Sequence, residues 1–178
     1  MFELINQEWS NPIFDLVLPF LRNKLFWIPL YLFLITFLAF NFGKKTIPFL
    51  LAIVICVMFT DFLSSEVIKK SVKRERPCRF YETAQNVQLR AHCGSGYSFT
   101  SSHAANHFGL AMIFSILFWK RRKKWSLIFL FWAGLISFSQ VYVGVHFPLD
   151  IFAGALIGIL IGFIVMYLYR VFISKIYE

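Results

Sequence analysis

The stretch SQVYVGVHFPLDIFAG, residues 139–154, joins two long apolar runs and carries a histidine and an aspartate four positions apart. Neither the run before the histidine, 125–145, nor the run after the aspartate, 151–169, contains a charged residue. Each run has about the ~20 residues that a helix needs to cross a membrane. The polar groups at this junction would therefore lie at the edge of the lipid.

The composition of the whole chain also indicates lipid as its solvent. Of the 178 residues, 58% are hydrophobic and 20% are aromatic, which is more apolar surface than a soluble domain of this size would carry. We therefore expect an all-α integral membrane protein built as a bundle of five spanning helices. The five apolar runs that predict these helices are 25–42, 46–63, 104–119, 125–145 and 151–169.

The rest of the chain predicts no second domain. The segment NPIFDLVLPFLR, residues 11–22, is short and charged, so we expect an interfacial or re-entrant helix, with a sixth span as the alternative. An outward connector covers about 77–100, and the single membrane-embedded domain covers 1–178. The net charge of +9 suits cytoplasmic loops and anionic headgroups, so the lipid bilayer is the expected partner and nucleic acid is not.

Five alternating spans would place the connector 77–100 and the turn 145–150 on the side of the N-terminus. The 18 Lys and Arg residues divide nine and nine between the two sides, so their count does not orient the chain. The basic run 120–124 in a tight connector is a strong signal for cytoplasmic retention. We therefore expect a bacterial cytoplasmic membrane protein with connector 77–100 facing the periplasm or the outside, and with a cytoplasmic C-terminus.

Two of the three cysteines flank this connector. Cys78 and Cys93 are 15 positions apart, whereas Cys56 lies within an apolar run. A disulfide that closes a loop of this size contributes ~3 kcal/mol in an oxidising compartment. We expect a Cys78–Cys93 disulfide, with two free thiols as the alternative.

A basic cluster, KKSVKRERP at residues 69–77, follows the second apolar run. The proline predicts that the helix ends at Arg76. Lys69, Lys73 and Arg76 would then share one helix face. A lysine point charge and an arginine fork suit a phosphate group, and a basic collar touching lipid headgroups is the alternative.

Two histidines lie at helix ends on the same side. In SFTSSHAANHFG, Ser101 or Ser102 can cap the third spanning helix, and His103 lies in its first turn. The free N–H groups and the dipole at that helix end favour an anion. In the opening stretch, Asp150 lies in the first turn of the fifth spanning helix, where it can fix the tautomer of His146. The convergence of these groups at one depth favours a functional site over three unrelated helix ends.

The order of these residues resembles the type 2 phosphatidic acid phosphatase family, whose superfamily includes lipid phosphate phosphatases and vanadium haloperoxidases. The resemblance covers roughly residues 61–158 and has three motifs. The matches are Lys69, Arg76 and Pro77, then Ser101 and His103, then Ser139, His146 and Asp150. This resemblance implies a phosphatase/haloperoxidase-like helical core.

The resemblance also implies a role for each matched side chain. His146 would be the nucleophile and form a phosphohistidine, Asp150 would orient its ring, and His103 would protonate the leaving oxygen. The groups that would hold the phosphate are Lys69, Arg76, Ser101 and the backbone near Ser102. Members of this family need no metal, so no cofactor is expected.

Two positions depart from the family pattern. Ser102 replaces a glycine, which alters how closely the backbone approaches the phosphate. Gln140 replaces the arginine that follows Ser139, and its neutral amide cannot fork onto phosphate as a guanidinium does. We expect Gln140 at the phosphate site and a nearby cation that replaces the lost charge. The candidates for that auxiliary cation are Lys73, Arg74, Arg79 and Arg90.

Two further interpretations concern the second histidine of the third helix. His107, one turn after His103, is expected to pack in the core, with a supporting contact to the site as the alternative. An alternative hypothesis is a metal site, with four side chains as ligands: His103, His107, His146 and Asp150. The cations Lys69 and Arg76 argue against a metal because they would repel it.

We therefore expect a membrane lipid phosphatase, a phosphoric ester or diphosphate hydrolase that acts at the outer face and releases inorganic phosphate. Undecaprenyl diphosphate is the first candidate substrate, before phosphatidylglycerophosphate, phosphatidic acid and the phosphates of lipid A. The alternatives are a catalytically impaired relative that transports or binds lipid, and the metal enzyme described above.

Overall fold

A computed structural model of the chain describes residues 1–80, 86–119 and 123–177, and these contain helices and loops but no strand. The helices are α1 (Pro12–Leu21), α2 (Ile28–Phe42), α3 (Thr46–Asp61), α4 (Lys69–Val72), α6 (Ser102–Phe118), α7 (Lys123–Tyr142) and α8 (Pro148–Tyr177). Short π or 3-10 turns are η1 (Leu4–Glu8), η2 (Lys24–Trp27), η3 (Gly43–Lys45) and η4 (Phe62–Ile68). The predicted connector and the predicted basic run each include residues outside the described part of the chain, 81–85 and 120–122.

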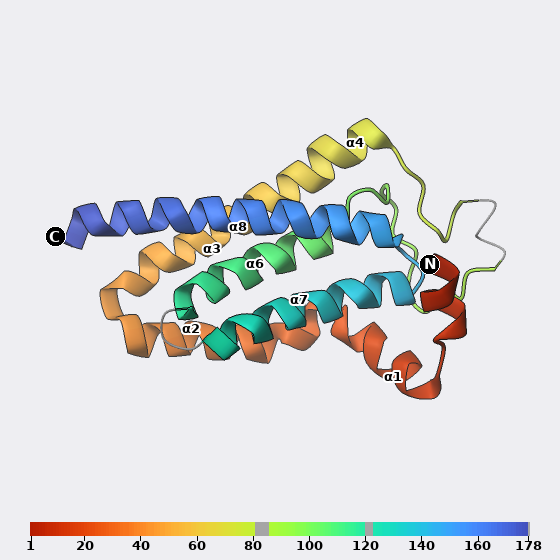
Figure 1. The fold of residues 1–178 in the computed structure, drawn as a ribbon, viewed down its shortest axis with the longest axis horizontal. Helices are drawn as coiled ribbons and strands as arrows, with labels where there is room; N and C mark the ends of the chain where they lie inside the picture. Colours follow the sequence, from red (N-terminus) through yellow and green to blue (C-terminus); the bar gives the residue numbers. More distant parts are fainter. Residues whose placement is uncertain (81–85, 120–122, 178) are drawn as a thin grey trace.

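The helices form an elongated bundle with α6 at its centre. Helix α6 packs against α8 and α7 and also contacts α3, which continues through η4 into α4 (Figure 1). The N-terminus, α1, the α4–α6 connector and the α7–α8 loop gather at one end, and the C-terminus lies at the other (Figure 1). The polar segments of the sequence are thereby brought to the same end of the bundle.

Each of the five apolar runs lies mainly in helix; Trp119 and residues 143–145 fall outside the helices. Two helical stretches are long and apolar enough to cross a membrane, by length and composition: Lys24–Val72, which includes α2 and α3, and Pro148–Ile173. Helices α6 and α7 are apolar but shorter. The predicted interfacial segment 11–22 forms α1, which Asn11 caps by accepting a hydrogen bond from the Phe14 amide.

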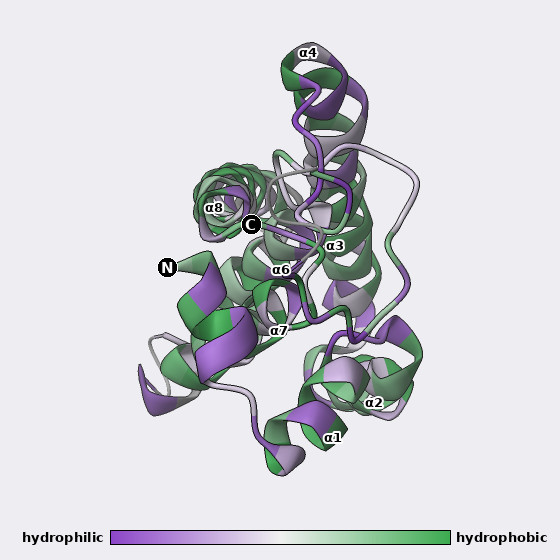
Figure 2. Ribbon diagram, turned by 90° about the vertical axis from the view of Figure 1, so that its right-hand side faces the viewer, coloured by the Kyte–Doolittle hydropathy of each residue, from purple (hydrophilic) through white to green (hydrophobic). Residues whose placement is uncertain are grey.

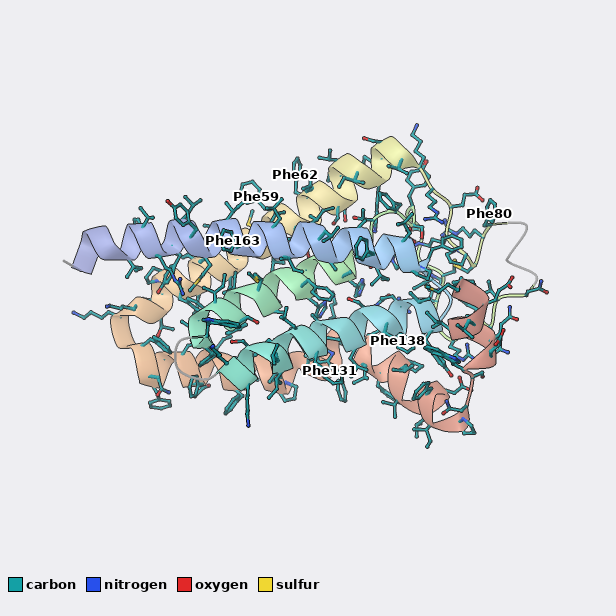
Figure 3. The ribbon with its side chains drawn as sticks, in the orientation of Figure 1. Phe59, Phe62, Phe80, Phe131, Phe138 and Phe163 are labelled. Carbon is teal, nitrogen blue, oxygen red and sulfur yellow. A yellow bond between two sulfur atoms is a disulfide. The ribbon has the colours of Figure 1, made fainter. Side chains whose placement is uncertain are left out.

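The outer surface of the bundle is apolar along the helices. Phe59, Phe62, Phe131 and Phe163 are 53–72% exposed and lie on the outside of the bundle (Figure 3). Viewed from the loop end, the ribbon is mostly hydrophobic in the helices, and hydrophilic segments concentrate in α4, the loops and the N-terminal turn (Figure 2). This distribution is consistent with a membrane protein, because so many exposed phenylalanines would be unfavourable in water.

Three glycines of α8 let its backbone lie against the backbone of α6. A Cβ atom at Gly154 would lie 2.5 Å from the carbonyl oxygen of Ser101, and one at Gly162 would lie 2.6 Å from that of Gly109. A Cβ at Gly158 would lie closer still to the α6 backbone. Small residues at every fourth position permit this approach in membrane helices, where van der Waals packing drives association.

The basic segment after α3 departs from the prediction. Helix α4 ends at Val72 because Lys73 takes a left-handed conformation with φ of 52°. The predicted continuation to Arg76 is wrong, and Lys69, Lys73 and Arg76 do not share a helix face. Beyond Lys73 the chain turns inward, where Arg74 and Arg76 bond to partners around the α7–α8 loop instead of continuing the helix.

The α6–α8 contact leads to a stability prediction. The substitution Gly158→Ala is expected to destabilise the protein by about 1–3 kcal/mol, because the added methyl group would force the two backbones apart. Thermal unfolding in detergent measures the effect.

The matched control for this prediction is Gly134→Ala in α7. A Cβ at Gly134 would meet no atom within 4 Å, so alanine there should be neutral or should stabilise the helix by up to about 1 kcal/mol. Equal unfolding temperatures for the two variants would contradict the proposed contact.

Candidate active site

The α7–α8 loop holds His146 in a buried position. Gly144 has φ of +83°, which allows the chain to turn sharply after α7. The backbone N–H groups of Val145 and His146 donate to the carbonyl of Gln140, at 3.2 and 3.3 Å. The His146 side chain is 2% exposed and is therefore held by the loop and its neighbours rather than by solvent.

Asp150, in the first turn of α8, is fully buried and accepts several hydrogen bonds. Its Oδ2 accepts from the amide of Phe147 at 2.8 Å and from the hydroxyl of Ser98. Its Oδ1 accepts from Nη1 of Arg74 at 3.0 Å in an ion pair. Nδ1 of His146 lies 3.4 Å from Oδ2. These donors keep Asp150 ionised and hold it beside the imidazole.

The contact between Arg76 and His146 determines the tautomer of the histidine. Nη1 of Arg76 lies 3.3 Å from Nε2 of His146. A guanidinium group can only donate, so Nε2 must be the acceptor and Nδ1 must carry the proton that faces Asp150. The lone pair of Nε2 therefore points toward the cation, where an anionic group would bind.

The charge state of His146 also suits a nucleophile. Burial lowers its pKa from 6.5 to about 4, against the hydrogen bond with Asp150, which raises it; the charge of Arg76 lowers it further. The imidazole is therefore neutral at physiological pH, which is the form that can attack a phosphorus atom.

Arg76 is held at the site by backbone carbonyl groups. Its Nε donates to the carbonyl of Gly96 at 2.8 Å, and its Nη1 donates to that of Val145 at 3.1 Å. The backbone of Gly94 lies against the guanidinium, since a Cβ there would be 3.4 Å from Nη2. Within the described residues no hydrogen bond engages Nη2, which leaves one N–H edge of the fork for a ligand.

The predicted disulfide between Cys78 and Cys93 is present. It closes the connector next to Arg76, and Arg79 reinforces the same loop by donating to the carbonyls of Ser95 and Gly94. The disulfide therefore ties Cys78, two residues after Arg76, to Cys93, which precedes the Gly94–Gly96 segment against the Arg76 guanidinium.

The N-terminus of α6 forms the opposite wall of the site. Ser101 caps the helix by accepting from the amide of Ala104 at 3.4 Å, and its own amide donates to the carbonyl of Asp150 at 3.0 Å. His103 follows in the first turn, close enough to His146 and Lys69 for their charges to interact. The structure thus brings His103, His146, Asp150, Lys69, Arg76 and Ser101 close to one another.

Two predicted residues occupy different surroundings from these. The hydroxyl of Ser102 bonds to those of Ser64 and Ser65, at 3.0 and 2.9 Å, and so joins α6 to η4. Gln140 is fully buried, and within the described residues neither atom of its amide has a hydrogen-bond partner. Lys73, which was predicted as an auxiliary cation, is exposed beyond the end of α4.

His107 supports the helix that carries His103. Its Nδ1 lies 2.8 Å from the carbonyl oxygen of His103, and its ring packs edge-on against Trp132 at 5.1 Å. His107 is buried. Its surroundings therefore agree better with the predicted core role than with the alternative role in the site.

Ser98 and the pairing of Arg74 were missed by the sequence analysis. Ser98 is buried and bonds to Asp150, with its hydroxyl 3.4 Å from Nδ1 of His146. Ser98 is not at a helical spacing from His146 or Asp150, so the local sequence pattern could not predict that they meet. Arg74 was predicted as an auxiliary cation for phosphate, whereas its guanidinium pairs with Asp150 and stacks 4.2 Å from the ring centre of Phe147.

An apolar cavity of about 510 Å³ lies between α2, α3, α6 and α7. Its polar lining comes from Asn106 and His107, one turn along α6 from His103. Its apolar lining includes Leu34, Leu38, Leu50, Ile53, Val57, Leu110 and Trp132. The cavity therefore lies within the apolar part of the bundle, and its end at Asn106 and His107 is next to the turn of α6 that carries His103.

The metal-binding alternative finds no support in the geometry. Within residues 1–80, 86–119 and 123–177, no group of three or more His, Cys, Asp or Glu side chains is arranged to hold a metal ion. The two ring nitrogens of His146 face a carboxylate and a guanidinium, respectively.

Comparison with known proteins gives consistent results. A sequence profile of the PAP2 superfamily matches residues 45–174. The chain is 33% identical over 152 residues to a lipid A 4'-phosphatase of Bacteroides thetaiotaomicron and 28% identical over 166 residues to one of Porphyromonas gingivalis. These alignments cover 83% and 90% of the chain but 66% and 69% of the relatives' lengths.

A solved structure resembles the whole fold. The crystal structure of Aquifex aeolicus LpxE superposes with a TM-score of 0.70 at 30% identity, covering 93% of this chain and 92% of the other. A PAP2-type phosphatidylglycerolphosphate phosphatase from Bacillus subtilis has the same TM-score at 22% identity, covering 99% and 86%, which supports the fold.

The buried histidine leads to a prediction about pH. The unfolded chain takes up a proton at His146 near pH 6.5, whereas the folded protein does so only near pH 4. The free energy of unfolding contributed by this residue should therefore decrease as the pH falls from about 6.5 to about 4. Thermal unfolding in detergent at several pH values, compared with His146→Gln, measures the contribution. An equal loss of stability in both proteins would contradict the assigned charge state.

Proposed function

The chain belongs to the PAP2 superfamily, and we propose that it is a membrane lipid phosphatase that releases inorganic phosphate from a lipid phosphate monoester or diphosphate. The observation that carries this proposal is the neutral His146, whose Nδ1 faces Asp150 and whose Nε2 faces Arg76. A nucleophile is thereby oriented by a carboxylate and aimed at a fixed cation.

The proposed reaction has two steps. In the first, the bound phosphate offsets the nearby positive charges that disfavour protonation of His103, so that His103 can carry a proton. Nε2 of His146 attacks phosphorus in line, the bond between phosphorus and the lipid oxygen breaks, and His103 gives its proton to that oxygen. In the second, His103 accepts a proton from water, the resulting hydroxyl oxygen bonds to phosphorus, and the P–N bond breaks. Inorganic phosphate leaves and both histidines return to their starting states.

The phosphate would be held by fixed positive groups. Lys69 and the open N–H edge of Arg76 supply charge, and the N-terminus of α6 beyond Ser101 supplies backbone N–H groups. Such preorganised donors stabilise the transferring phosphoryl group mainly through position and charge.

The lipid tail would remain in apolar surroundings. The cavity between α2, α3, α6 and α7 lies next to His107 and Asn106, on the membrane side of the site. An acyl chain in this cavity would leave its phosphate at the polar end of the bundle, which supports a lipid rather than a soluble phosphate ester as substrate.

The relatives' names guide the choice of substrate. Undecaprenyl diphosphate is the first candidate from the sequence, and one of the relatives, from Sulfolobus acidocaldarius, is an undecaprenyl-diphosphatase at 30% identity. The two lipid A 4'-phosphatases favour a phosphate of lipid A instead. We therefore propose lipid A phosphate as the first substrate to test and undecaprenyl diphosphate as the second.

We propose that the site faces the periplasm of a bacterial inner membrane and that the C-terminus faces the cytoplasm. The Cys78–Cys93 disulfide at the site end of the bundle supports this orientation, because disulfides persist in oxidising compartments. The basic residues Lys123 and Lys124 lie at the start of α7, at the opposite end.

Phosphate release by the purified protein tests the proposed function. Wild-type protein in detergent should release phosphate from at least one of lipid A, undecaprenyl diphosphate, phosphatidylglycerophosphate and phosphatidic acid. His146→Ala should lower turnover to background, because no nucleophile remains, while unfolding at a temperature close to that of wild type.

Three results would count against this proposal. Turnover by His146→Ala near the wild-type rate would exclude the phosphohistidine route. Activity that disappears with a chelator and returns with a divalent metal would favour the metal-enzyme alternative. Lipid binding without turnover on any substrate of the panel would favour a transporter or an impaired relative.

Orientation of His146 by Asp150 gives a second prediction. Asp150→Asn keeps the size of the side chain but removes the negative charge, so the amide can also favour the wrong tautomer. Turnover should fall by roughly 100- to 10,000-fold, as expected for loss of a histidine-orienting carboxylate. A matched substitution, Glu66→Gln, removes a carboxylate that pairs with Lys70 on the surface and should leave turnover unchanged.

A further inference from the structure

The phosphate site lacks one cation that the family pattern predicts. Gln140 is neutral and buried, and its amide makes no hydrogen bond within the described residues. Lys69 and Arg76 remain at the site, but a phosphate monoester carries close to two negative charges and several acceptor oxygens. An additional guanidinium would complete the set of donors around it.

The cations named in the sequence analysis have other partners or positions. Arg74 pairs with Asp150, and Arg79 donates to carbonyls of the connector. Arg90 pairs with Asp15 and holds the N-terminal segment. Lys73 is exposed beyond α4. Each is therefore poorly suited to a substrate phosphate.

Arg22, in contrast, comes from a part of the chain outside the family match, which begins at residue 45. It is the residue that ends α1, and its amide donates to the carbonyl of Leu18. Helix α1 lies at the same end of the bundle as the N-terminus and the connector (Figure 1). The fold thus brings the helix that this arginine follows to the end of the bundle where the site lies.

A continuous series of contacts connects the end of α1 to α6. The indole Nε1 of Trp27 donates to the carbonyl of Leu21, the residue before Arg22, at 2.7 Å. The ring of Trp27 packs against that of Trp132 at 5.5 Å, and Trp132 packs against His107 at 5.1 Å. Leu21, Trp27 and Trp132 are half-buried and His107 is buried, so these contacts hold the end of α1 in place.

The last contact in this series reaches the candidate acid. His107 lies 2.8 Å, through Nδ1, from the carbonyl oxygen of His103, and the two rings are stacked with centres 6.3 Å apart. The end of α1 is therefore positioned, through packed side chains, against the face of α6 that carries His103.

The charges around Arg22 agree with this placement. Burial lowers the pKa of Arg22. Burial also lowers the pKa of Arg76, and the charges of Arg79 and Arg22 lower it further. The charge of Arg22 also interacts with His103. These interactions agree with the packing that places the end of α1 beside the face of α6 that carries His103.

No described carboxylate compensates the charge of Arg22. Within residues 1–80, 86–119 and 123–177, its guanidinium has neither a hydrogen bond nor an ion pair. Two half-buried guanidinium groups that repel each other are unfavourable without an anion between them. A bound dianion would convert this repulsion into attraction from both sides.

We propose that Arg22 binds the phosphate of the substrate together with Arg76 and Lys69, and supplies the guanidinium that is missing at position 140. This inference rests on the proposed lipid phosphatase function. It makes the N-terminal segment part of the substrate site and assigns the ligand group as a phosphate dianion.

Binding of inorganic phosphate, the product, tests this without turnover. The unfolding temperature of the protein in detergent, measured against phosphate concentration, reports the dissociation constant. Arg22→Gln should weaken phosphate binding about 10-fold, as expected for loss of a charge-assisted hydrogen bond. Arg22→Lys keeps the charge but not the fork and should lie between wild type and Arg22→Gln.

The matched control is Lys24→Gln, which removes the same charge two positions further along the chain. Lys24 is exposed, so phosphate binding and turnover should remain at the wild-type level. In turnover assays, Arg22→Gln should lower kcat/KM by about 10- to 100-fold. Circular dichroism and gel filtration establish that each variant is folded. If Arg22→Gln does not fold, Arg22→Lys is compared with the wild-type protein instead.

The outcomes separate this inference from the proposed function. An active wild-type protein whose phosphate affinity and kcat/KM are unchanged in Arg22→Gln would overturn the role of Arg22 alone. Equal losses in Arg22→Gln and Lys24→Gln would overturn it as well, since they would indicate a general charge effect. A wild-type protein that neither binds phosphate nor hydrolyses any lipid of the panel would overturn both.

Discussion

Close packing between the backbones of α6 and α8 is the contact on which the site depends. Gly154, Gly158 and Gly162 remove the side chains that would separate the two helices. At the polar end, the amide of Ser101 donates to the carbonyl of Asp150 and joins the beginnings of both helices. The histidines at these helix ends are therefore positioned by rigid backbone, and this is the preorganisation that phosphoryl transfer requires.

The charges at this end of the bundle divide into two functions. Arg74 neutralises the buried Asp150, so the carboxylate can orient His146 without an unpaired charge in the protein interior. Arg76 is held by backbone carbonyls instead of by a carboxylate, and it keeps its full charge for an anion. The disulfide-closed connector maintains that arrangement. The pocket thus has a net positive charge before a substrate arrives, which favours phosphate over neutral ligands.

Much of the site could be predicted from the sequence because its groups lie at helix ends with local signatures. Ser101 before an apolar run marks a helix start, and the spacing of His146 and Asp150 across a proline places both at the next one. The end of α4 could not be predicted in this way. Pro77 indicated a helix to Arg76, but the hydrogen bonds that Arg76 makes with distant carbonyls outweigh another helical turn. Local propensity carries no information about such partners.

The sequence alone determined the solvent of the helices, their approximate ranges and the chemical groups at their ends, because hydrophobicity and capping depend on neighbouring residues. The tertiary structure decided which cation pairs with which partner. Arg74 and Asp150 are 76 positions apart, and Arg90 and Asp15 are 75 positions apart, so no local pattern relates them. The same holds for the end of α1, which aromatic packing through Trp27 and Trp132 joins to His107 of α6. Charged side chains are long and flexible, and the packed backbone determines which of them meet.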